Sequence, residues 1–325
     1  MIIKKINLWC LSLFMAASTV PFIQAQSHTE LIPFGDFENW VTRDISESAL
    51  LGGKKKQVYA IAPNKHIEGN KAYSNMGGSP WASSNVMANV MGIVKTSNTV
   101  FPEDRETGGR CACMKTIIEN CKVIGMVNLK VLVSGSIFLG KVHEPIRSTN
   151  DPYSKMDMGI PFTKRPKSLI FDYKVKATGD NYRTLSTGFS SMKKVAGKDS
   201  AEVYILLQHR WEDADGNVYA HRVGTGRERF VNSTSGWVNN HVMPVYYGDI
   251  TKHSFYKPYM GLIPEDKCYY CQNSKGKIVP VHEVGWGKED EEVTHMLVMA
   301  SSACGTAYLG SIGNMFWIDN IRLGY

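Results

Sequence analysis

Short apolar runs, many with alternating polar positions, occupy most of the chain after residue 30. In Leu169–Val175, large apolar residues alternate with Asp172 and Lys174, a pattern typical of a strand with one face in a core. Val203–Leu207 is apolar without interruption, which predicts a central strand covered on both faces. Gly, Asn, Pro and Ser separate the runs. The pattern predicts an all-β fold.

The C-terminal segment contains two strand-like runs, Met296–Ala300 and Met315–Leu323. Burying an unpaired carboxylate costs several kcal/mol, and the candidates for a partner of Asp319 lie in Gly35–Trp40. We therefore expect the first strand to lie beside the last, with Glu38 close to Asp319. Strict alternation places Asp319 on one face with the following large residues: Met315, Trp317, Ile321, Leu323 and Tyr325.

One segment departs from the strand pattern. The apolar residues of Val86–Val94 recur at helical spacing behind Asn85, a candidate N-cap, which predicts a short helix. Two stretches, Gly140–Pro161 and Tyr247–Val293, are expected to be long loops, and loops of that length are often functional.

The first 25 residues have the form of a signal peptide. Lys4 and Lys5 precede the apolar stretch Leu8–Ile23, and Ala25 is a suitable cleavage position. We expect residues 26–325 to form one domain of the exported protein, with no integral membrane segment after cleavage. The residues do not distinguish a periplasmic from an extracellular or cell-surface location.

Charge excludes one class of partner. The formal net charge of +7 falls to +5 without the signal peptide, and the chain has no basic run or motif for nucleic acid. We therefore expect no nucleic-acid partner.

Cysteines leave two alternatives open. Without Cys10 six remain, and either disulfides or free thiols are consistent with their positions. Cys111 and Cys113 share a strand face and cannot readily bond to each other, but either one could reach Cys121 across a hairpin. Cys268–Cys271 has the CxxC spacing of a tight disulfide or of half a zinc site, but no second CxxC or HxxxH completes a zinc set.

Several motifs, in order along the chain, resemble the putative carbohydrate metabolism domain family of exported proteins from glycan-degrading gut bacteria. This resemblance implies a β-sandwich of jelly-roll type, here with long loop insertions, and a role in carbohydrate recognition or breakdown. It supplies no catalytic residues. The motifs are Gly35–Trp40, Ser134–Gly140, Gly159–Pro166 before Leu169–Lys174, Met243–Tyr247, Ala300–Ser302, and Gly310–Gly313 before Trp317–Leu323.

The two ends of the mature chain also resemble family 4 and family 22 carbohydrate-binding modules. Those jelly rolls commonly hold a structural calcium ion where the chain ends meet. The resemblance implies Glu38 and Asp319 as Ca²⁺ ligands, with Asp36 nearby, because oxygen ligands suit this ion. The alternative is that both carboxylates accept backbone hydrogen bonds at strand ends.

Carbohydrate recognition needs an aromatic face for the sugar ring and polar groups for its hydroxyls. Trp81 and Asn85 are candidates because they belong to a loop of small polar residues, and Trp286 is a candidate because it lies between two glycines in the second long loop. Trp40 and Trp317 are expected in the core, since each lies in or beside a terminal strand.

Hydrolysis of a glycosidic bond needs two carboxylates at a defined separation. Several acidic residues are available, but none lies in a motif, and the sequence identifies no dyad. They are Glu144, Asp151, Asp157, Glu202 and Glu283.

Three functions remain as alternatives. The first is an exported protein that binds a glycan or oligosaccharide and assists polysaccharide capture or breakdown. The second is a glycoside hydrolase or related carbohydrate-active enzyme, for which no catalytic motif is visible. The third is a structural or adhesive cell-surface protein whose sandwich is a scaffold.

Overall fold

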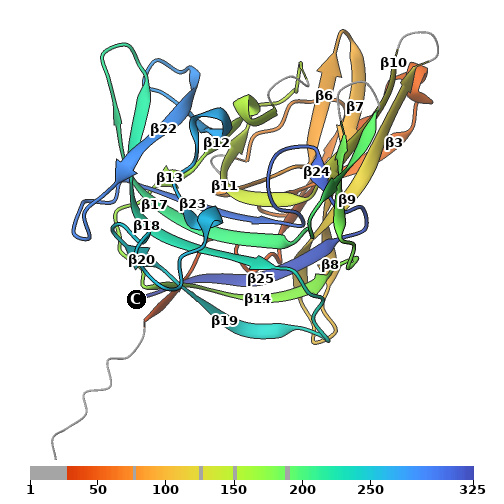
Figure 1. Cartoon of the computed structure of the whole chain (residues 1–325). Helices are drawn as coiled ribbons and strands as arrows, with labels where there is room; N and C mark the ends of the chain where they lie inside the picture. The colour runs from red at the N-terminus through yellow and green to blue at the C-terminus, as the bar shows by residue number, and fades with distance from the viewer. Residues whose placement is uncertain (1–27, 76–77, 124–126, 149–151, 187–190) are drawn as a thin grey trace, which may run out of the picture.

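The structure, a computed structural model, describes residues 28–75, 78–123, 127–148, 152–186 and 191–325 (Figure 1). The predicted signal peptide, residues 1–25, lies outside these ranges. Strands make up nearly all of the regular structure, which confirms the all-β prediction. None of the helical turns in these ranges has the length and apolar character needed to cross a membrane. The turns are η1 (Ala49–Leu51), η2 (Pro152–Lys155), η3 (Pro258–Met260) and η4 (Glu265–Lys267).

Two large sheets form the sandwich, and the first has the order β10-β9-β25-β14-β19. Strand β1 pairs with β25, and β8 pairs with β9. The strands of this sheet are β1 (Thr29–Leu31), β8 (Val100–Asp104), β9 (Arg110–Val123), β10 (Val127–Ser134), β14 (Ser168–Lys176), β19 (Val238–Pro244) and β25 (Met315–Gly324).

The second sheet has the order β12-β11-β23-β17-β18-β22-β21 and is strongly curled (Figure 1). Strand β13 pairs with β23, β20 with β18, and β5 with β11. The strands of this sheet are β5 (Trp81–Ser83), β11 (Ser136–Val142), β12 (Met156–Met158), β13 (Ile160–Pro161), β17 (Ala201–Glu212), β18 (Val218–Phe230), β20 (Tyr246–Tyr247), β21 (Tyr269–Gln272), β22 (Ile278–Trp286) and β23 (His295–Ser301).

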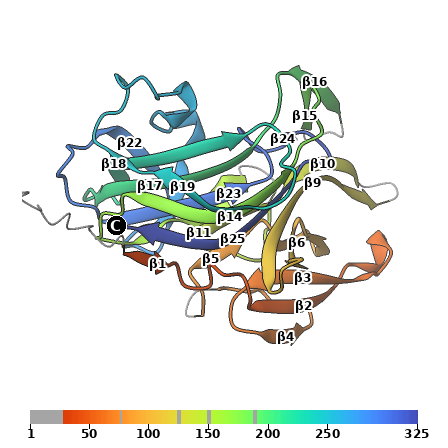
Figure 2. The ribbon, with the colours of Figure 1, turned by 90° about the horizontal axis from the view of Figure 1, so that it is seen from below.

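Three smaller sheets lie beside the sandwich. The N-terminal one, β3-β2-β4, is seen at the side of the large sheets in Figure 2. The others are the hairpin β6-β7 and the sheet β16-β15-β24. Their strands are β2 (Trp40–Ser46), β3 (Lys55–Ile61), β4 (Lys65–Glu68), β6 (Val86–Val90), β7 (Ile93–Ser97), β15 (Tyr182–Ser186), β16 (Met192–Ala196) and β24 (Leu309–Gly310).

Strand β17 is the central strand that the sequence predicted. It lies between β23 and β18, and its first eight residues are all buried. Val203, Ile205 and Leu207 pack into the core between the two large sheets, whereas Tyr204 and Leu206 belong to a second cluster on the opposite face. Burial of one such aliphatic side chain contributes about 1.5–3 kcal/mol. Strand β17 therefore stabilises both faces of its sheet.

The two ends of the described chain lie side by side, as predicted. Strand β1 pairs antiparallel with β25. Beyond β1, the Ile32 N–H donates to the Ile321 carbonyl at 3.0 Å, and the Ile321 N–H donates to the Gly35 carbonyl at 2.9 Å. A Cβ on Gly35 would lie 2.8 Å from two carbonyl oxygens, so this close approach requires glycine.

The predicted alternation along β25 holds only in part. Asn320 has φ 54° and lies in a β-bulge opposite β14. The bulge shifts the alternation by one residue, so Phe316 and Ile318 face the core before it and Ile321 faces the core after it. Trp317 is half-buried and donates a hydrogen bond to Glu103, so the prediction of Trp317 in the core was wrong.

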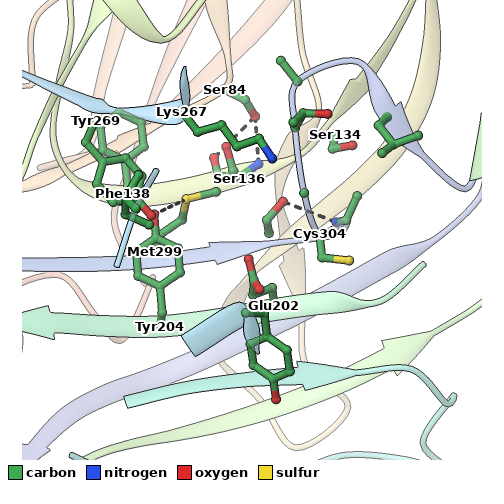
Figure 3. A pocket seen from close by; sticks show the side chains of 18 of the residues that line it. Ser84, Ser134, Ser136, Phe138, Glu202, Tyr204, Lys267, Tyr269, Met299 and Cys304 are labelled. Carbon is green, nitrogen blue, oxygen red and sulfur yellow. Dashed lines mark hydrogen bonds between the residues drawn. The ribbon is translucent and has the colours of Figure 1, made fainter. Parts of the chain in front are cut away.

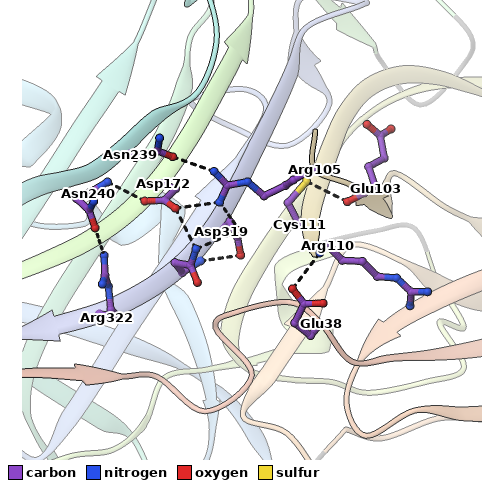
Figure 4. Close-up of polar contacts among 11 residues, drawn as sticks. Glu38, Glu103, Arg105, Arg110, Cys111, Asp172, Asn239, Asn240, Asp319 and Arg322 are labelled. Atoms are coloured by element: carbon purple, nitrogen blue, oxygen red, sulfur yellow. Dashed lines mark hydrogen bonds and ion pairs between the residues drawn. The ribbon is translucent and has the colours of Figure 1, made fainter. Parts of the chain in front are cut away.

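Asp319 is buried, and its partner is Arg105, which follows β8 (Figure 4). The positive charge that pairs with Asp319 therefore does not come from the predicted partner segment, Gly35–Trp40. Arg105 Nη1 lies 2.5 Å from Asp319 Oδ2 and 2.9 Å from Asp172 Oδ2, and all three side chains are less than a tenth exposed. One guanidinium therefore faces two buried carboxylates.

This imbalance separates the pKa values of the two carboxyl groups. Burial raises the pKa of Asp319 to about 6, although its hydrogen bond to Arg105 lowers it. Burial also opposes the charge of Asp172, but the hydrogen bonds from Asn240 and Asn320 outweigh it and lower the pKa of Asp172.

The predicted helix at Val86–Val94 is wrong. The segment forms the hairpin of β6 and β7, whose turn residues Met91 and Gly92 have φ 52° and 82°. Two successive positive φ values match a two-residue type I′ turn, which joins twisted strands. Its β-branched residues also favour strands over helices.

The described cysteine side chains form no disulfide. Cys111 and Cys113 share β9 with Cys121, whose side chain lies outside the described residues. Eight or more residues along one strand separate Cys121 from them by roughly 26 Å. The hairpin bridge is therefore wrong. Cys268 and Cys271 are both free thiols, so the tight CxxC disulfide is wrong as well.

Replacing Arg105 with methionine should strongly destabilise the fold. Arg105→Met leaves two buried carboxylates without a counter-charge, and loss of one partner of a buried ion pair costs about 3–5 kcal/mol. Arg110→Met is the matched control, because Arg110 lies at the same β8–β9 turn with a half-exposed side chain. We expect urea denaturation to show a large loss for the first variant and almost none for the second. Equal losses would contradict the role of Arg105.

Asp319→Asn should change how stability depends on pH. The folded pKa of Asp319, about 6, lies above its usual 3.8, so the folded state binds the extra proton. The stability that this protonation contributes is present below about pH 4 and is lost as pH rises to about 6, at up to about 1.4 kcal/mol per pH unit. The variant lacks this loss. We expect the free energy of unfolding of the variant, relative to that of the wild type, to rise across this pH window. If the two free energies change in parallel with pH, the raised pKa of Asp319 is contradicted.

Candidate functional site

A cleft of about 440 Å³ opens on the face of the second sheet that lies away from the core between the two large sheets. Its floor is formed by β11, β17, β18 and β23. One wall is the segment 258–269, which contains η3 and η4, and the other wall is the segment 303–309. Ligand sites commonly have this size and concave shape. The floor residues include Phe138, Glu202, Tyr204, Arg227, Arg229, Met299 and Ser301.

The charged part of the floor results from strand register. In the pairing of β17 with β18, Glu202 lies opposite Arg229, and Tyr204 lies opposite Arg227. The Glu202 carboxylate accepts hydrogen bonds from Arg227 at 3.1 and 3.0 Å and from Arg229 at 2.6 Å. One buried carboxylate thus orients two guanidinium groups, and the trio has a net positive charge.

Aromatic rings lie against the two guanidinium groups. The Arg229 guanidinium lies 4.4 Å from the ring centre of Tyr259, and the Arg227 guanidinium lies 5.1 Å from that of Tyr204. The ring of Tyr204 is 6.0 Å from the ring of Tyr269. Figure 3 shows Tyr204 and Tyr269 grouped at one end of the cleft, with Glu202 farther along the floor.

The two outer tyrosines are available to a ligand. Tyr259 and Tyr269 are half-buried, whereas Tyr204 is almost fully buried. Burial raises the pKa of both Tyr259 and Tyr269 further above its usual value near 10, and each hydroxyl therefore stays a possible hydrogen-bond donor at neutral pH. The cleft therefore offers ring surface and hydroxyl donors beside guanidinium groups.

A buried ion pair holds the first wall. Arg222 and Glu283 form an ion pair, and both side chains are essentially fully buried. Glu283 also accepts a hydrogen bond from the Ile263 N–H at 2.7 Å, and Gln208 donates to it at 2.5 Å. Because Ile263 lines the cleft, the position of this wall depends on a charge pair beneath it.

Trp81, a predicted carbohydrate-binding residue, is a core residue. Its indole is fully buried in the core cluster, its Nε1 donates to the Pro33 carbonyl at 2.9 Å, and its ring contacts Phe37 edge-on. A buried ring offers no face to a sugar, so this assignment is corrected. Trp40 is in the core, as predicted.

The other two predicted binding residues lie elsewhere. Asn85 is buried, and its Oδ1 accepts the N–H groups of Thr99 and Val100 at 2.8 and 2.9 Å, which is a structural role. Trp286 is half-buried at the end of β22, with the Arg222 guanidinium 5.9 Å from its ring centre. The described lining of the cleft includes neither of them. The structure does not bring the three residues together.

The candidate carboxylates for hydrolysis are also dispersed. Among the described residues that line the cleft, Glu202 is the one carboxylate. Glu144, Asp157 and Glu283 are engaged by basic side chains elsewhere. Asp151 lies outside the described residues. The described part of the cleft therefore shows no pair of facing carboxylates.

The carboxylates expected to bind calcium have other contacts. Glu38 is exposed and accepts the Arg110 N–H at 3.0 Å, whereas Asp319 is buried against Arg105 (Figure 4). Within the described ranges, the groups of three ligating side chains with donor atoms less than 4.8 Å apart do not include these residues or Asp36. Calcium at Glu38 and Asp319 stays a prediction.

Apart from Glu202, which is among the acidic residues considered for hydrolysis, the polar and aromatic residues of the cleft described above were not predicted from the sequence. Arg227 and Arg229 alternate on β18, which indicates a common basic face, but their proximity to Glu202 depends on register. Tyr259 and Tyr269 belong to the second long loop, whose length was the available signal. Part of that loop is in fact ordered as β21 and β22.

No curated protein matches the chain. A crystal structure of a putative glycoside hydrolase from Bacteroides thetaiotaomicron VPI-5482 is 17% identical, with a TM-score of 0.44, over 87% of this chain and 70% of the other. One from Bacteroides vulgatus ATCC 8482 is 15% identical, with a TM-score of 0.40, over 91% of this chain and 94% of the other.

A family model supplies the stronger result. The model described as "Putative carbohydrate metabolism domain" matches residues 36–240. This range contains β17 and β18, with the Glu202, Arg227 and Arg229 side chains of the cleft floor. Because the match covers more than half of the chain, the protein belongs to the putative carbohydrate metabolism domain family.

Proposed function

We propose that the protein binds a carbohydrate chain in the cleft of the second sheet. The proposal rests on two half-buried tyrosines, Tyr259 and Tyr269, in a cleft whose floor also carries two guanidinium groups. Membership of a carbohydrate-related family supports the same ligand class. The proposed site is therefore the cleft, and not Trp81 or Trp286, which the sequence had indicated.

The contacts suit sugars for a physical reason. A sugar ring has apolar C–H faces and a rim of hydroxyl groups, so it needs an aromatic surface with donors and acceptors around it. Ion pairs with Glu202 hold Arg227 and Arg229 in place before a ligand arrives. This preorganisation reduces the entropy lost on binding.

The charge of the cleft favours an acidic carbohydrate. Glu202 balances one of the two arginines on the floor, and Lys267 adds an exposed ammonium group on the wall. Guanidinium groups bind carboxylate and sulfate oxygens through paired hydrogen bonds. We therefore include uronic-acid or sulfated glycans in the proposal.

A binder is favoured over a hydrolase by the single carboxylate in the described lining. Glu202 forms ion pairs with two arginines and has no facing carboxylate there. Together with the signal peptide indicated by the sequence, the proposal is an exported protein of the periplasm or cell surface that assists enzymes acting on polysaccharides.

Tyr259→Ala should weaken glycan binding by about tenfold or more. The variant loses one stacking contact, and a binding free energy of about 1.4 kcal/mol corresponds to a tenfold change in affinity. A glycan array identifies a retained glycan, and titration calorimetry with it measures the affinities. Trp211→Ala is the matched control, since Trp211 is a partly exposed aromatic residue outside the cleft.

Three other outcomes would contradict glycan binding in the cleft. Equal losses in both variants, or no retained glycan, would contradict binding in the cleft. Release of reducing sugar from polysaccharides that is abolished by Glu202→Gln would instead identify an enzyme. Self-association or cell adhesion without glycan binding would identify an adhesive protein.

Binding of a uronic-acid or sulfated glycan should weaken several-fold as salt rises to about 0.5 M, because ions screen the partly exposed charges. Arg229→Gln should reduce the affinity at low salt and flatten the salt dependence. Lys164→Gln removes the same charge outside the cleft and should do neither. If neutral and acidic glycans bind equally well at low salt, the acidic class is wrong while carbohydrate binding is retained.

A further inference from the structure

Three side chains with metal-binding atoms meet where the first wall of the cleft lies beside β22. Glu265 begins η4, Cys268 directly follows it, and His282 lies on β22. Residues three apart in a 3-10 turn project to the same side, which brings Glu265 and Cys268 together. Because β21 pairs with β22 through Tyr269 and Val281, the neighbouring residues Cys268 and His282 also approach each other.

The donor atoms are close enough to share one ion. Glu265 Oε1 lies 2.5 Å from His282 Nδ1, and Glu265 Oε2 lies 3.9 Å from Cys268 Sγ. All three donor atoms lie within 4.8 Å of one another. Tetrahedral zinc with bonds of 2.0–2.3 Å needs ligand atoms roughly 3.3–3.5 Å apart. The largely exposed Glu265 side chain is free to make this small adjustment.

We propose that Glu265, Cys268 and His282 bind a zinc ion. A thiolate, an imidazole and a carboxylate together match the ligand preferences of Zn²⁺, and the thiolate disfavours calcium and magnesium. Three protein ligands leave a fourth position, which water fills from the exposed side of Glu265. This proposal does not depend on carbohydrate binding.

The other cysteine of the CxxC pair does not take part. Cys271 packs on β21 in a small apolar cluster with Val218, Ala220 and Val281. Cys271 therefore has a packing role. The ligands that join Cys268 are the Glu265 carboxylate, from the turn η4, and the His282 imidazole, from the strand β22.

A zinc ion here would connect the turn η4 to β22. The same stretch of chain supplies Lys267 and Tyr269 to the cleft, so the ion would restrict the movement of that wall. A second group, Asp44, His66 and Glu68, lacks a thiol, and Lys55 Nζ already lies 3.0 Å from Asp44 Oδ2. This second group provides the control.

Elemental analysis of the full-length protein, purified without a polyhistidine tag and dialysed against buffer with zinc chloride, should find one zinc per chain. Cobalt chloride added to the metal-free protein should give a thiolate-to-cobalt charge-transfer band. Cys268→Ser should abolish the band, and His282→Ala should abolish stoichiometric zinc. His66→Ala should change neither. Zinc should also raise the melting temperature of the wild type, because an ion that binds the folded state stabilises it.

The outcomes are decisive even if one variant folds poorly. Circular dichroism identifies such a variant, and His282→Ala then replaces Cys268→Ser as the test, because the His282 side chain is only half-buried. Wild-type protein without stoichiometric zinc or a thiolate band would overturn the proposal. Zinc that survives both substitutions, or that is lost in His66→Ala, would also overturn it.

Discussion

The alternation of side chains along β17 is the constraint on which the rest of the structure depends. Successive residues of a strand point to opposite faces, so one strand supplies Val203 and Ile205 to the core and Glu202 and Tyr204 to the cleft. A shift of register by one residue would exchange these sets and bury a charge in the core. The stability of the sandwich and the chemistry of the cleft therefore rest on the same strand pairing.

Buried ion pairs connect parts of the chain that are distant in sequence. Arg105 reaches Asp319, and Arg222 holds Glu283 beneath the first wall of the cleft. Such pairs add little net stability compared with apolar packing, but removal of one partner is costly. They act mainly as positional constraints. In this protein, the constraints fix the last strand and one wall of the cleft.

The first wall of the cleft contributes residues to both the proposed carbohydrate site and the proposed zinc site. Tyr259 and Tyr269 belong to the segment that a hydrogen bond to Glu283 holds in place and that the proposed zinc ion would join to β22. A wall made mostly of irregular backbone loses much conformational entropy when a ligand orders it. Bonds that order the wall in advance reduce that loss, which is how an open surface between strands becomes a defined binding site.

The sequence by itself determined the all-β class, the strands β14 and β17, and the meeting of the two ends. Uninterrupted apolar residues identified β17, and alternation identified β14, because these patterns depend only on which faces are buried. It did not determine the bulge at Asn320, which moved Trp317 out of the core, or the turn at Met91, which made a hairpin from an apparent helix. Both depend on backbone conformations that residue type constrains weakly.

Only the tertiary structure decided the sites. Glu202 meets Arg227 and Arg229 through strand register, and Cys268 meets His282 through the pairing of β21 with β22. The physical reason is that a site requires side chains to be close in space, whereas sequence patterns report how each residue is exposed to water. Exposure is a local property that periodicity reveals, but proximity is set by the packing of the whole chain.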